Sequence, residues 1–229
     1  EPIHVINARR REWSRIKGGG LARALRARSV DVLLISDVRG DDPAVIGSGP
    51  LFDPTGETVG IRHHLVATQS HALDAAQETA RALGHACHRH DAFLGGDVTD
   101  AAATIAATLR DGPPGVHLWG GEPTVRLPPN PGRGGRNQHL ALLLAERLQD
   151  QPGWMALVSG TDGGDGATED AGALVDGRTV ARGQSAGTDL AAALAAFSSG
   201  DFLEAAGDLV TTGPTGTNVM DLVIACRLG

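Results

Sequence analysis

The sequence contains no tyrosine and few aromatic residues of any kind. Aromatic side chains make up 3% of the 229 residues, so the flat surfaces on which proteins stack nucleic-acid bases are scarce. The formal net charge is −7, and nucleic-acid binding depends on positive charge. We therefore expect no nucleic-acid partner.

Cysteines and long apolar runs are also scarce. Cys87 and Cys226 form a single distant pair, which argues against a disulfide framework or a zinc site and favours a reducing cytoplasm. No apolar run approaches the roughly 20 residues of a membrane span, and no signal peptide is recognisable. We expect a cytoplasmic protein without membrane contact.

An initiator methionine is missing as well. The chain begins with Glu1, its first methionine is Met155, and the basic segment 3–28 resembles the middle of a domain. We expect a processed or partial protein.

What is present is typical of a globular α/β protein. Hydrophobic residues make up 41% of the chain and charged residues 21%, which is enough to form a core. Short apolar runs alternate with helical patterns, and this alternation predicts a mostly parallel sheet flanked by helices. The predicted strands are 30–36, 64–68, 85–90, 116–119, 154–158, 209–211 and 222–225, and the predicted helices are 70–83, 97–109, 140–148 and 190–196.

One segment indicates a domain boundary. Residues 47–60 are rich in Gly, Pro, Asp and Thr, as linkers and shortened connections often are. We predict an N-terminal domain over residues 1–57 and a C-terminal α/β domain over 58–229.

The segment 132–138, Gly-Arg-Gly-Gly-Arg-Asn-Gln, is the most informative motif. It places two guanidinium groups and an amide on a glycine-rich loop just before an apolar helix. Helix N-termini present free N–H groups to anions, and arginine pairs well with carboxylates and phosphates. Arg136 is a better candidate than Arg133, because it lies at the helix start. The alternative is a solvated loop.

Four other turns carry candidate groups. Residues 36–42 and 161–166 are rich in aspartate and could position Mg²⁺ or a hydroxyl group, but capped Asp-Gly turns would look the same. Residues 120–124 could bring backbone and a carboxylate to a ligand, or could form a simple hairpin turn. Residues 213–218 are a candidate anion nest but do not form a Walker A loop.

Lys17, followed by three glycines, could bind phosphate; the alternative is a break between two helices. The chain has neither a dinucleotide-binding Gly-x-Gly-x-x-Gly after a strand nor a Gly-x-Ser-x-Gly elbow. The histidines lack partners at ligand spacing, which favours structural or solvated roles over a metal site.

Six motifs in order resemble the glycerate 2-kinase family, whose C-terminal part is the MOFRL domain and whose members are sometimes labelled hydroxypyruvate reductases. Each motif alone is weak, but together they cover nearly the whole chain. The motifs are 6–19, 34–50, 120–122, 132–138, 161–166 and 213–219.

The resemblance implies ATP-dependent phosphorylation of D-glycerate to 2-phosphoglycerate with Mg²⁺. Phosphoryl transfer needs positioning and charge neutralisation, and Arg136 could clamp the glycerate carboxylate or the migrating phosphoryl group. A homodimer remains open. We assign catalytic roles to Arg136, Asp37 and Lys17, substrate binding to Glu122, Asn137, Arg133, Asp162, Thr215 and Asn218, and metal binding to Asp41, Asp162 and Asp165.

The chain departs from the family pattern in three respects. The family's N-terminal nucleotide-fold half is missing ahead of Glu1, the connection after Pro50 is short, and Pro123 replaces a threonine. We therefore expect residues 1–57 to be the remainder of a Rossmann-like domain, and part of the ATP site to lie outside this chain. Two rival interpretations remain: a hydroxypyruvate reductase and a non-catalytic substrate-binding module.

Overall fold

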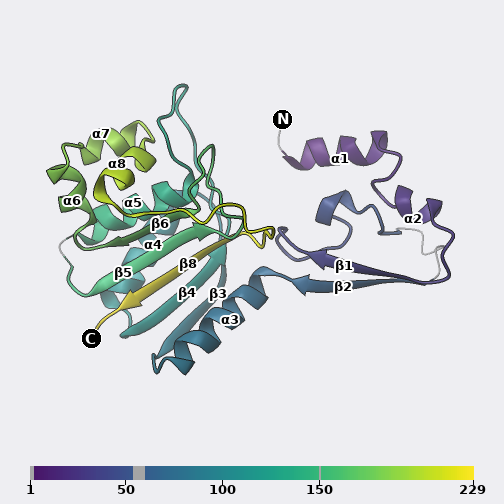
Figure 1. Ribbon diagram of the computed structural model, residues 1–229, viewed down its shortest axis with the longest axis horizontal. Helices are drawn as coiled ribbons and strands as arrows, with labels where there is room; N and C mark the ends of the chain where they lie inside the picture. The colour runs from purple at the N-terminus through teal and green to yellow at the C-terminus, as the bar shows by residue number, and fades with distance from the viewer. Residues whose placement is uncertain (1–2, 54–59, 150) are drawn as a thin grey trace. The chain divides into compact units, whose positions relative to one another are not determined.

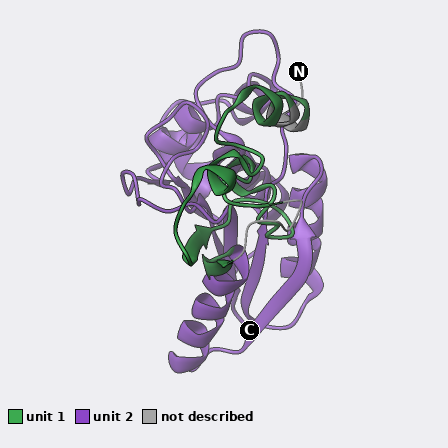
Figure 2. Cartoon of the chain, turned by 90° about the vertical axis from the view of Figure 1, so that its right-hand side faces the viewer, with its two compact units in different colours: residues 1–68 green, residues 69–229 purple. Residues whose placement is uncertain are grey.

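The computed structural model describes residues 3–53, 60–149 and 151–229. The chain forms two compact units, residues 1–68 and 69–229, which are coloured separately in Figure 2. The division falls after the second strand and not within segment 47–60. Part of that predicted linker lies outside the described residues.

The first unit contains a two-stranded parallel sheet. In it β1 (Val30–Ile35) pairs with β2 (Ile61–Ala67), and Val30 lies opposite Ile61. This pairing explains why the division lies beyond β2, since β2 completes a sheet begun by β1. The helical elements of this unit are α1 (Ile3–Trp13), α2 (Gly20–Ala24) and the 3-10 turn η1 (Ile46–Ser48).

The second unit is built on a six-stranded sheet with the order β3-β4-β8-β5-β6-β7. The last strand of the chain lies in the middle of this sheet, between β4 and β5 (Figure 1). The strands are β3 (Cys87–Leu94), β4 (Gly115–Gly121), β5 (Trp154–Gly160), β6 (Gly172–Asp176), β7 (Leu209–Val210) and β8 (Asp221–Arg227). The helices are α3 (Gln69–Ala82), α4 (Val98–Asp111), α5 (Arg136–Leu148), α6 (Thr179–Ser185), α7 (Leu190–Ala195) and α8 (Ser199–Ala206).

The α/β class with flanking helices is confirmed, but the prediction of a mostly parallel sheet is wrong for the second unit. Only β3 and β4 run parallel in its sheet, and the other four pairings are antiparallel. The parallel pair is joined by α4, as a strand–helix–strand unit requires. Short buried apolar runs look alike in both kinds of sheet, so the pattern could not show the direction of β8.

Helix α5 lies at the centre of the hydrophobic core. Its residues Leu140, Leu142 and Leu144 are completely buried, because the helix packs on β5 and β6 of the sheet and on the helices α4 and α8. Each buried leucine stabilises the fold by about 2 kcal/mol relative to exposure. The core therefore holds the first turn of α5 in a fixed place.

The sheet has helices on both faces near β4. His117 of β4 faces the end of α4, whereas Gly120 faces the side chain of Gln69 in α3. These two positions differ by an odd number of residues and so point to opposite faces. Figure 1 accordingly shows α3 in front of the sheet and α4 behind it.

Most predicted elements are observed, with shifts of a few residues at their ends. The predicted strands and helices do not include α1 and α2 of the first unit, nor β6, α6 and α8 of the second, which lie in segments rich in Gly, Ser and Asp. Among the described residues, no helix is long and apolar enough to span a bilayer.

Candidate functional site

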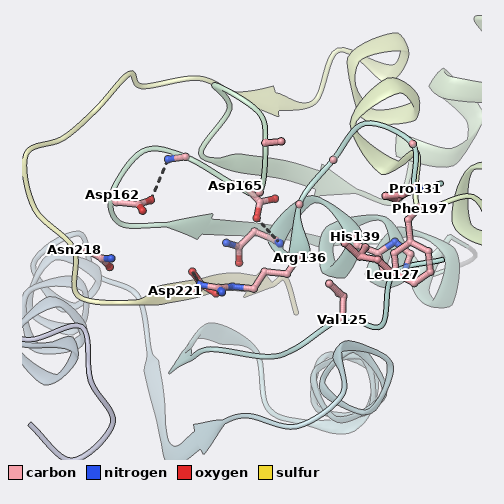
Figure 3. Close-up of a pocket in the computed structure, with 17 residues that line it drawn as sticks. Val125, Leu127, Pro131, Arg136, His139, Asp162, Asp165, Phe197, Asn218 and Asp221 are labelled. Carbon is pink, nitrogen blue, oxygen red and sulfur yellow. Dashed lines mark hydrogen bonds and ion pairs between the residues drawn. The ribbon is translucent and has the colours of Figure 1, made fainter. Parts of the chain in front are cut away.

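A pocket of about 460 Å³ opens at one edge of the six-stranded sheet. The loop after β4, the start of α5, the loop after β5 and the loop before β8 all contribute to it. Because β8 runs antiparallel to β4 and β5, its first residue lies at the same edge as their last residues. Figure 3 shows the side chains that these segments bring together.

Arg136 is the first residue of α5 and lines this pocket. Its Nε and one terminal nitrogen donate to the two carboxylate oxygens of Asp221, at 2.6 and 3.1 Å, and the other terminal nitrogen lies 3.0 Å from an oxygen of Glu122. Burial by itself lowers the pKa of the guanidinium, but Asp221 and Glu122 outweigh it and raise that pKa. Arg136 thus stays charged and is held at a defined angle.

Two N–H groups of Arg136 remain for a ligand. A guanidinium has five N–H donors, and the contacts with Asp221 and Glu122 use three of them in the described part of the chain. The side chain keeps 34% of its surface exposed. It can therefore bind an anion while its own carboxylates hold it in position.

Two of the backbone N–H groups at the start of α5 are occupied by the chain itself. One carboxylate oxygen of Asp165 accepts from the N–H of Asn137 at 3.0 Å, and the other accepts from the N–H of Gln138 at 2.8 Å. These two N–H groups are therefore not available to an anion. Only glycine fits at position 135, since a Cβ there would lie 2.2 Å from Cγ of Asp165.

Asp165 is a buried carboxyl group with an altered pKa. Burial raises the pKa to about 6, two hydrogen bonds from backbone N–H groups partly oppose this, and the negative charge of Asp221 adds to the rise. Its role in the structure is to cap α5 and to fasten the loop after β5 to that helix.

The carboxamide of Asn137 is an unusual feature of the pocket wall. Asn137 is 2% exposed, lines the pocket, and its Oδ1 has no hydrogen-bond partner among the described residues. A buried polar atom without a partner costs free energy, about 1–3 kcal/mol. Asn137 is thus a buried polar side chain in the pocket wall whose acceptor is not satisfied by the described residues.

Two further predicted residues, Asp162 and Asn218, line the same pocket. Asp162 is exposed and accepts one hydrogen bond, from the N–H of Gly164 at 3.1 Å. Asn218 uses its Oδ1 to accept from the N–H of Met220 at 2.9 Å. The Asp162 carboxylate and the Asn218 amide nitrogen are therefore oriented by their own turns.

Thr215 and Arg133 are directed elsewhere. The hydroxyl group of Thr215 donates to the carbonyl oxygen of Thr161 at 2.7 Å, and this contact fixes the loop before β8. Arg133 binds Glu204 at 2.6 Å and Asp170 at 2.9 Å. Neither residue is among those that line the pocket, so their substrate-binding roles remain predictions.

The other three predicted residues belong to the first unit, whereas the pocket is formed within the second. Lys17 donates from Nζ to the carbonyl oxygen of Gly47 at 2.8 Å. Asp37 and Asp41 follow β1, and Asp41 has a left-handed backbone with φ of 54°. Their catalytic and metal-binding roles remain predictions.

The glycines after Lys17 are less open to phosphate than expected. The N–H of Gly18 donates to the carbonyl oxygen of Ser48 at 2.9 Å, and the N–H of Gly19 donates to that of Gly49 at 2.8 Å. These N–H groups join two segments of the first unit, in place of the phosphate contact considered from the sequence.

The sequence interpretation missed the apolar residues of the pocket, and it also missed Asp221, His139 and Phe197. In the sequence, Asp221 stands directly before the buried apolar run 222–225. This isolated carboxylate at the start of a strand was the one feature that could have indicated a site residue there. His139 and Phe197 are far apart in sequence, but their rings stack with centroids 4.2 Å apart. Burial lowers the pKa of His139 to about 4, so its ring is neutral at pH 7.

The chain matches two family models. Residues 115–221 match the "MOFRL family", and residues 1–83 match a family described as "Domain of unknown function (DUF4147)". Together the two matches cover most of the chain.

Curated relatives are similar over nearly the whole chain. A "Glycerate 2-kinase" from Pyrococcus horikoshii is 32% identical, with 97% of this chain and 61% of the relative covered. A protein from Agrobacterium vitis named "Putative hydroxypyruvate reductase" is 38% identical, with 96% and 60% covered. The chain therefore spans about 60% of the length of these relatives.

A solved structure gives the same result. The crystal structure of glycerate kinase from Thermotoga maritima superposes with a TM-score of 0.89 at 31% identity, and the match covers 99% of this chain and 64% of that one. The resemblance inferred from the six motifs is confirmed. The family models, the relatives and this structural match together show that the chain belongs to the glycerate 2-kinase family.

Proposed function

We propose that the intact protein transfers the γ-phosphoryl group of ATP to the 2-hydroxyl group of D-glycerate. A bond forms between the hydroxyl oxygen and the γ-phosphorus, the bond from that phosphorus to the β–γ bridging oxygen breaks, and ADP, 2-phosphoglycerate and the proton of the hydroxyl group result. Family membership supports this reaction, and the geometry around Arg136 supports the location of the site.

The arrangement of Arg136 is the observation that carries the proposal. Phosphoryl transfer is catalysed chiefly by fixed positive charge around the phosphoryl oxygens. Arg136 is held by Asp221 and Glu122 and keeps two N–H donors for a ligand. We assign these donors to the migrating phosphoryl group, and the carboxylate of D-glycerate is the alternative.

Asn137 supports a polar acceptor substrate. Its unpartnered Oδ1 needs a donor, and D-glycerate offers two hydroxyl groups. The amide nitrogen of Asn218 and the carboxylate of Glu122 provide further polar contacts at or beside the same pocket. This set suits a small, hydroxylated anion.

The described residues fit Mg²⁺ only as an ion that arrives with the nucleotide. No group of three or more His, Cys, Asp or Glu side chains that could hold a metal is found in the described ranges. Mg²⁺ in kinases is typically held by one or two carboxylates, water and phosphate oxygens. Asp162 is exposed in the pocket and fits as such a ligand; Asp165 does not, because both its oxygens bind the start of α5. When bound, the ion would neutralise charge on the phosphates.

An assay of ADP release by the intact protein tests the function. We expect ADP formation with Mg²⁺-ATP that depends on D-glycerate, with a product phosphorylated at the 2-position in phosphorus NMR. L-glycerate serves as the control acceptor. No glycerate-dependent ADP formation would contradict the proposal.

The name of the Agrobacterium vitis relative supports a second candidate, reduction of hydroxypyruvate. Oxidation of NADH on addition of hydroxypyruvate tests it in the same preparation. Binding of D-glycerate without either reaction would favour the third interpretation, a substrate-binding module. A homodimer and a cytoplasmic location remain predictions.

A further inference from the structure

The pocket has two chemically different halves. Figure 3 shows Arg136, Asp162, Asp165, Asn218 and Asp221 on one side and Val125, Leu127, Pro131, His139 and Phe197 on the other. D-glycerate is small and carries a polar group on every carbon, so it offers little apolar surface that could pack against an apolar wall. The second half of the pocket therefore suits a different, more apolar group than D-glycerate.

The centre of this apolar wall is a ring that the fold holds rigidly. Phe197 stacks on His139 with an interplanar angle of 14°. His139 is in turn fixed by a 2.8 Å hydrogen bond between its Nδ1 and the hydroxyl group of Ser199. A flat, supported aromatic ring is a good platform for another flat ring.

The backbone of Phe197 is strained where it carries this ring. α7 ends in a Schellman motif, in which the N–H of Phe197 donates to the carbonyl oxygen of Leu194 and the N–H of Ser198 donates to that of Ala193. Phe197 occupies the left-handed position, with φ of 53°, where glycine is the usual residue. A bulky residue is a true outlier there, and such outliers gather at ligand sites.

The wall is also tied to the loop that carries Arg136. The N–H of Gly132 donates to the carbonyl oxygen of Ala196 at 2.8 Å, and a Cβ at position 132 would lie 2.5 Å from the Ser198 side chain. The glycine loop thus runs directly past the turn that presents Phe197. A ligand that covers both halves would pass along this loop.

We infer that the wall formed by Val125, Leu127, Pro131 and Phe197 binds the nucleobase of the phosphoryl donor, with its phosphates directed toward Arg136. This inference rests on the proposed function. A nucleoside triphosphate joins a flat, largely apolar ring system to a highly charged tail, and this is the distribution of chemistry in the pocket. The side chains of the wall have no hydrogen-bonding groups. Phe197 offers a ring for stacking, and Val125, Leu127 and Pro131 offer apolar contact around it.

Substitution Phe197→Gly in the intact protein distinguishes the contribution of the ring to binding from its contribution to folding. Glycine suits the left-handed backbone, so the variant should fold with an unchanged or raised Tm. Base–aromatic stacking contributes enough that its loss should raise the KM for ATP about tenfold, while the KM for D-glycerate changes by less than about twofold. Leu83→Gly is the matched control, because Leu83 is an exposed apolar residue just after the end of α3.

Calorimetric binding of a non-hydrolysable ATP analogue provides a readout without turnover. We expect its Kd to rise about tenfold in Phe197→Gly and to stay the same in Leu83→Gly. An unchanged Kd and KM for nucleotide would overturn the inference, as would a rise in the KM for D-glycerate alone. If wild-type protein binds the analogue at the wall but does not phosphorylate D-glycerate, the proposed function fails and the subsite stands.

Discussion

The two arginines of the glycine loop differ less in their surroundings than in their direction. Arg133 and Arg136 are three residues apart, and their side chains are 38% and 34% exposed. Each pairs with one buried carboxylate, and in addition Arg136 pairs with one exposed carboxylate and Arg133 with two. Arg136 lines the pocket and Arg133 does not. Exposure and ion pairing thus fail to identify the functional arginine, and the direction of the side chain decides.

The largest effect is expected from Arg136→Lys. A lysine cannot keep the two-point contact with Asp221 and also present two donors to a phosphoryl group, so kcat should fall about 100-fold. Steady-state kinetics measure this, and Arg133→Lys is the matched control, with kcat within about threefold of wild type. Equal losses in both variants would abolish the distinction between the arginines. A rise in the KM for D-glycerate with kcat retained would assign Arg136 to the carboxylate instead.

The buried carboxylates offer a second matched pair. Asp221 and Asp170 are 6% and 9% exposed, and each binds one of the two arginines. Asp221→Asn and Asp170→Asn should each lower the free energy of unfolding by about 1–3 kcal/mol, because a buried charged hydrogen bond is weakened. Only Asp221→Asn should also lower kcat/KM, by about tenfold, because the Arg136 side chain loses the two-point contact that orients it toward the pocket. Equal activity in the two variants would show that Asp221 does not position Arg136.

The cap of α5 should make stability depend on pH. Asp165 has a pKa near 6 in the folded protein and an ordinary value of 3.8, so the folded state binds the proton more tightly than the unfolded state. Its contribution to stability is therefore fully present below about pH 4 and is lost as the pH rises through about 6, by about 2–3 kcal/mol. Asp165→Asn removes this titration and keeps one of the two acceptor oxygens that cap α5.

Urea unfolding of wild type and Asp165→Asn between pH 4 and 7.5 measures the effect. As the pH rises, the unfolding free energy of the wild type should fall relative to that of Asp165→Asn. The titration of all other groups is the same in both proteins and does not contribute to this difference. A constant difference, or one of opposite sign, would show that Asp165 is not destabilised by its burial.

The smallest effects are expected at the exposed carboxylates. Glu122 and Glu204 are 46% and 65% exposed, and exposed ion pairs contribute about 0.2–1 kcal/mol to stability. Glu122→Gln should lower kcat/KM two- to threefold, because Arg136 loses one of the two carboxylates that hold its side chain in position. Glu204→Gln should leave kcat/KM unchanged, because Glu204 pairs with Arg133. A tenfold loss in Glu122→Gln would indicate that Glu122 contacts substrate directly.

The site was predictable where its chemistry is local. A glycine loop with Arg136 and Asn137 before an apolar helix was recognisable, as were the turn at Asp162 and the loop at Asn218. The occupation of the helix N-terminus by Asp165 was not, because the contact joins residues 28 positions apart. The same limit applies to Asp221, whose partner Arg136 lies 85 positions earlier.

The sequence by itself determined the family, the α/β class and most of the elements, because ordered motifs and apolar periodicity are local properties. Only the tertiary structure decided that β8 enters the sheet antiparallel between β4 and β5, and with it that Asp221 meets Arg136. Strand direction and partner choice depend on which surfaces the whole chain buries together. The division of the pocket into a charged and an apolar half is decided at that level too.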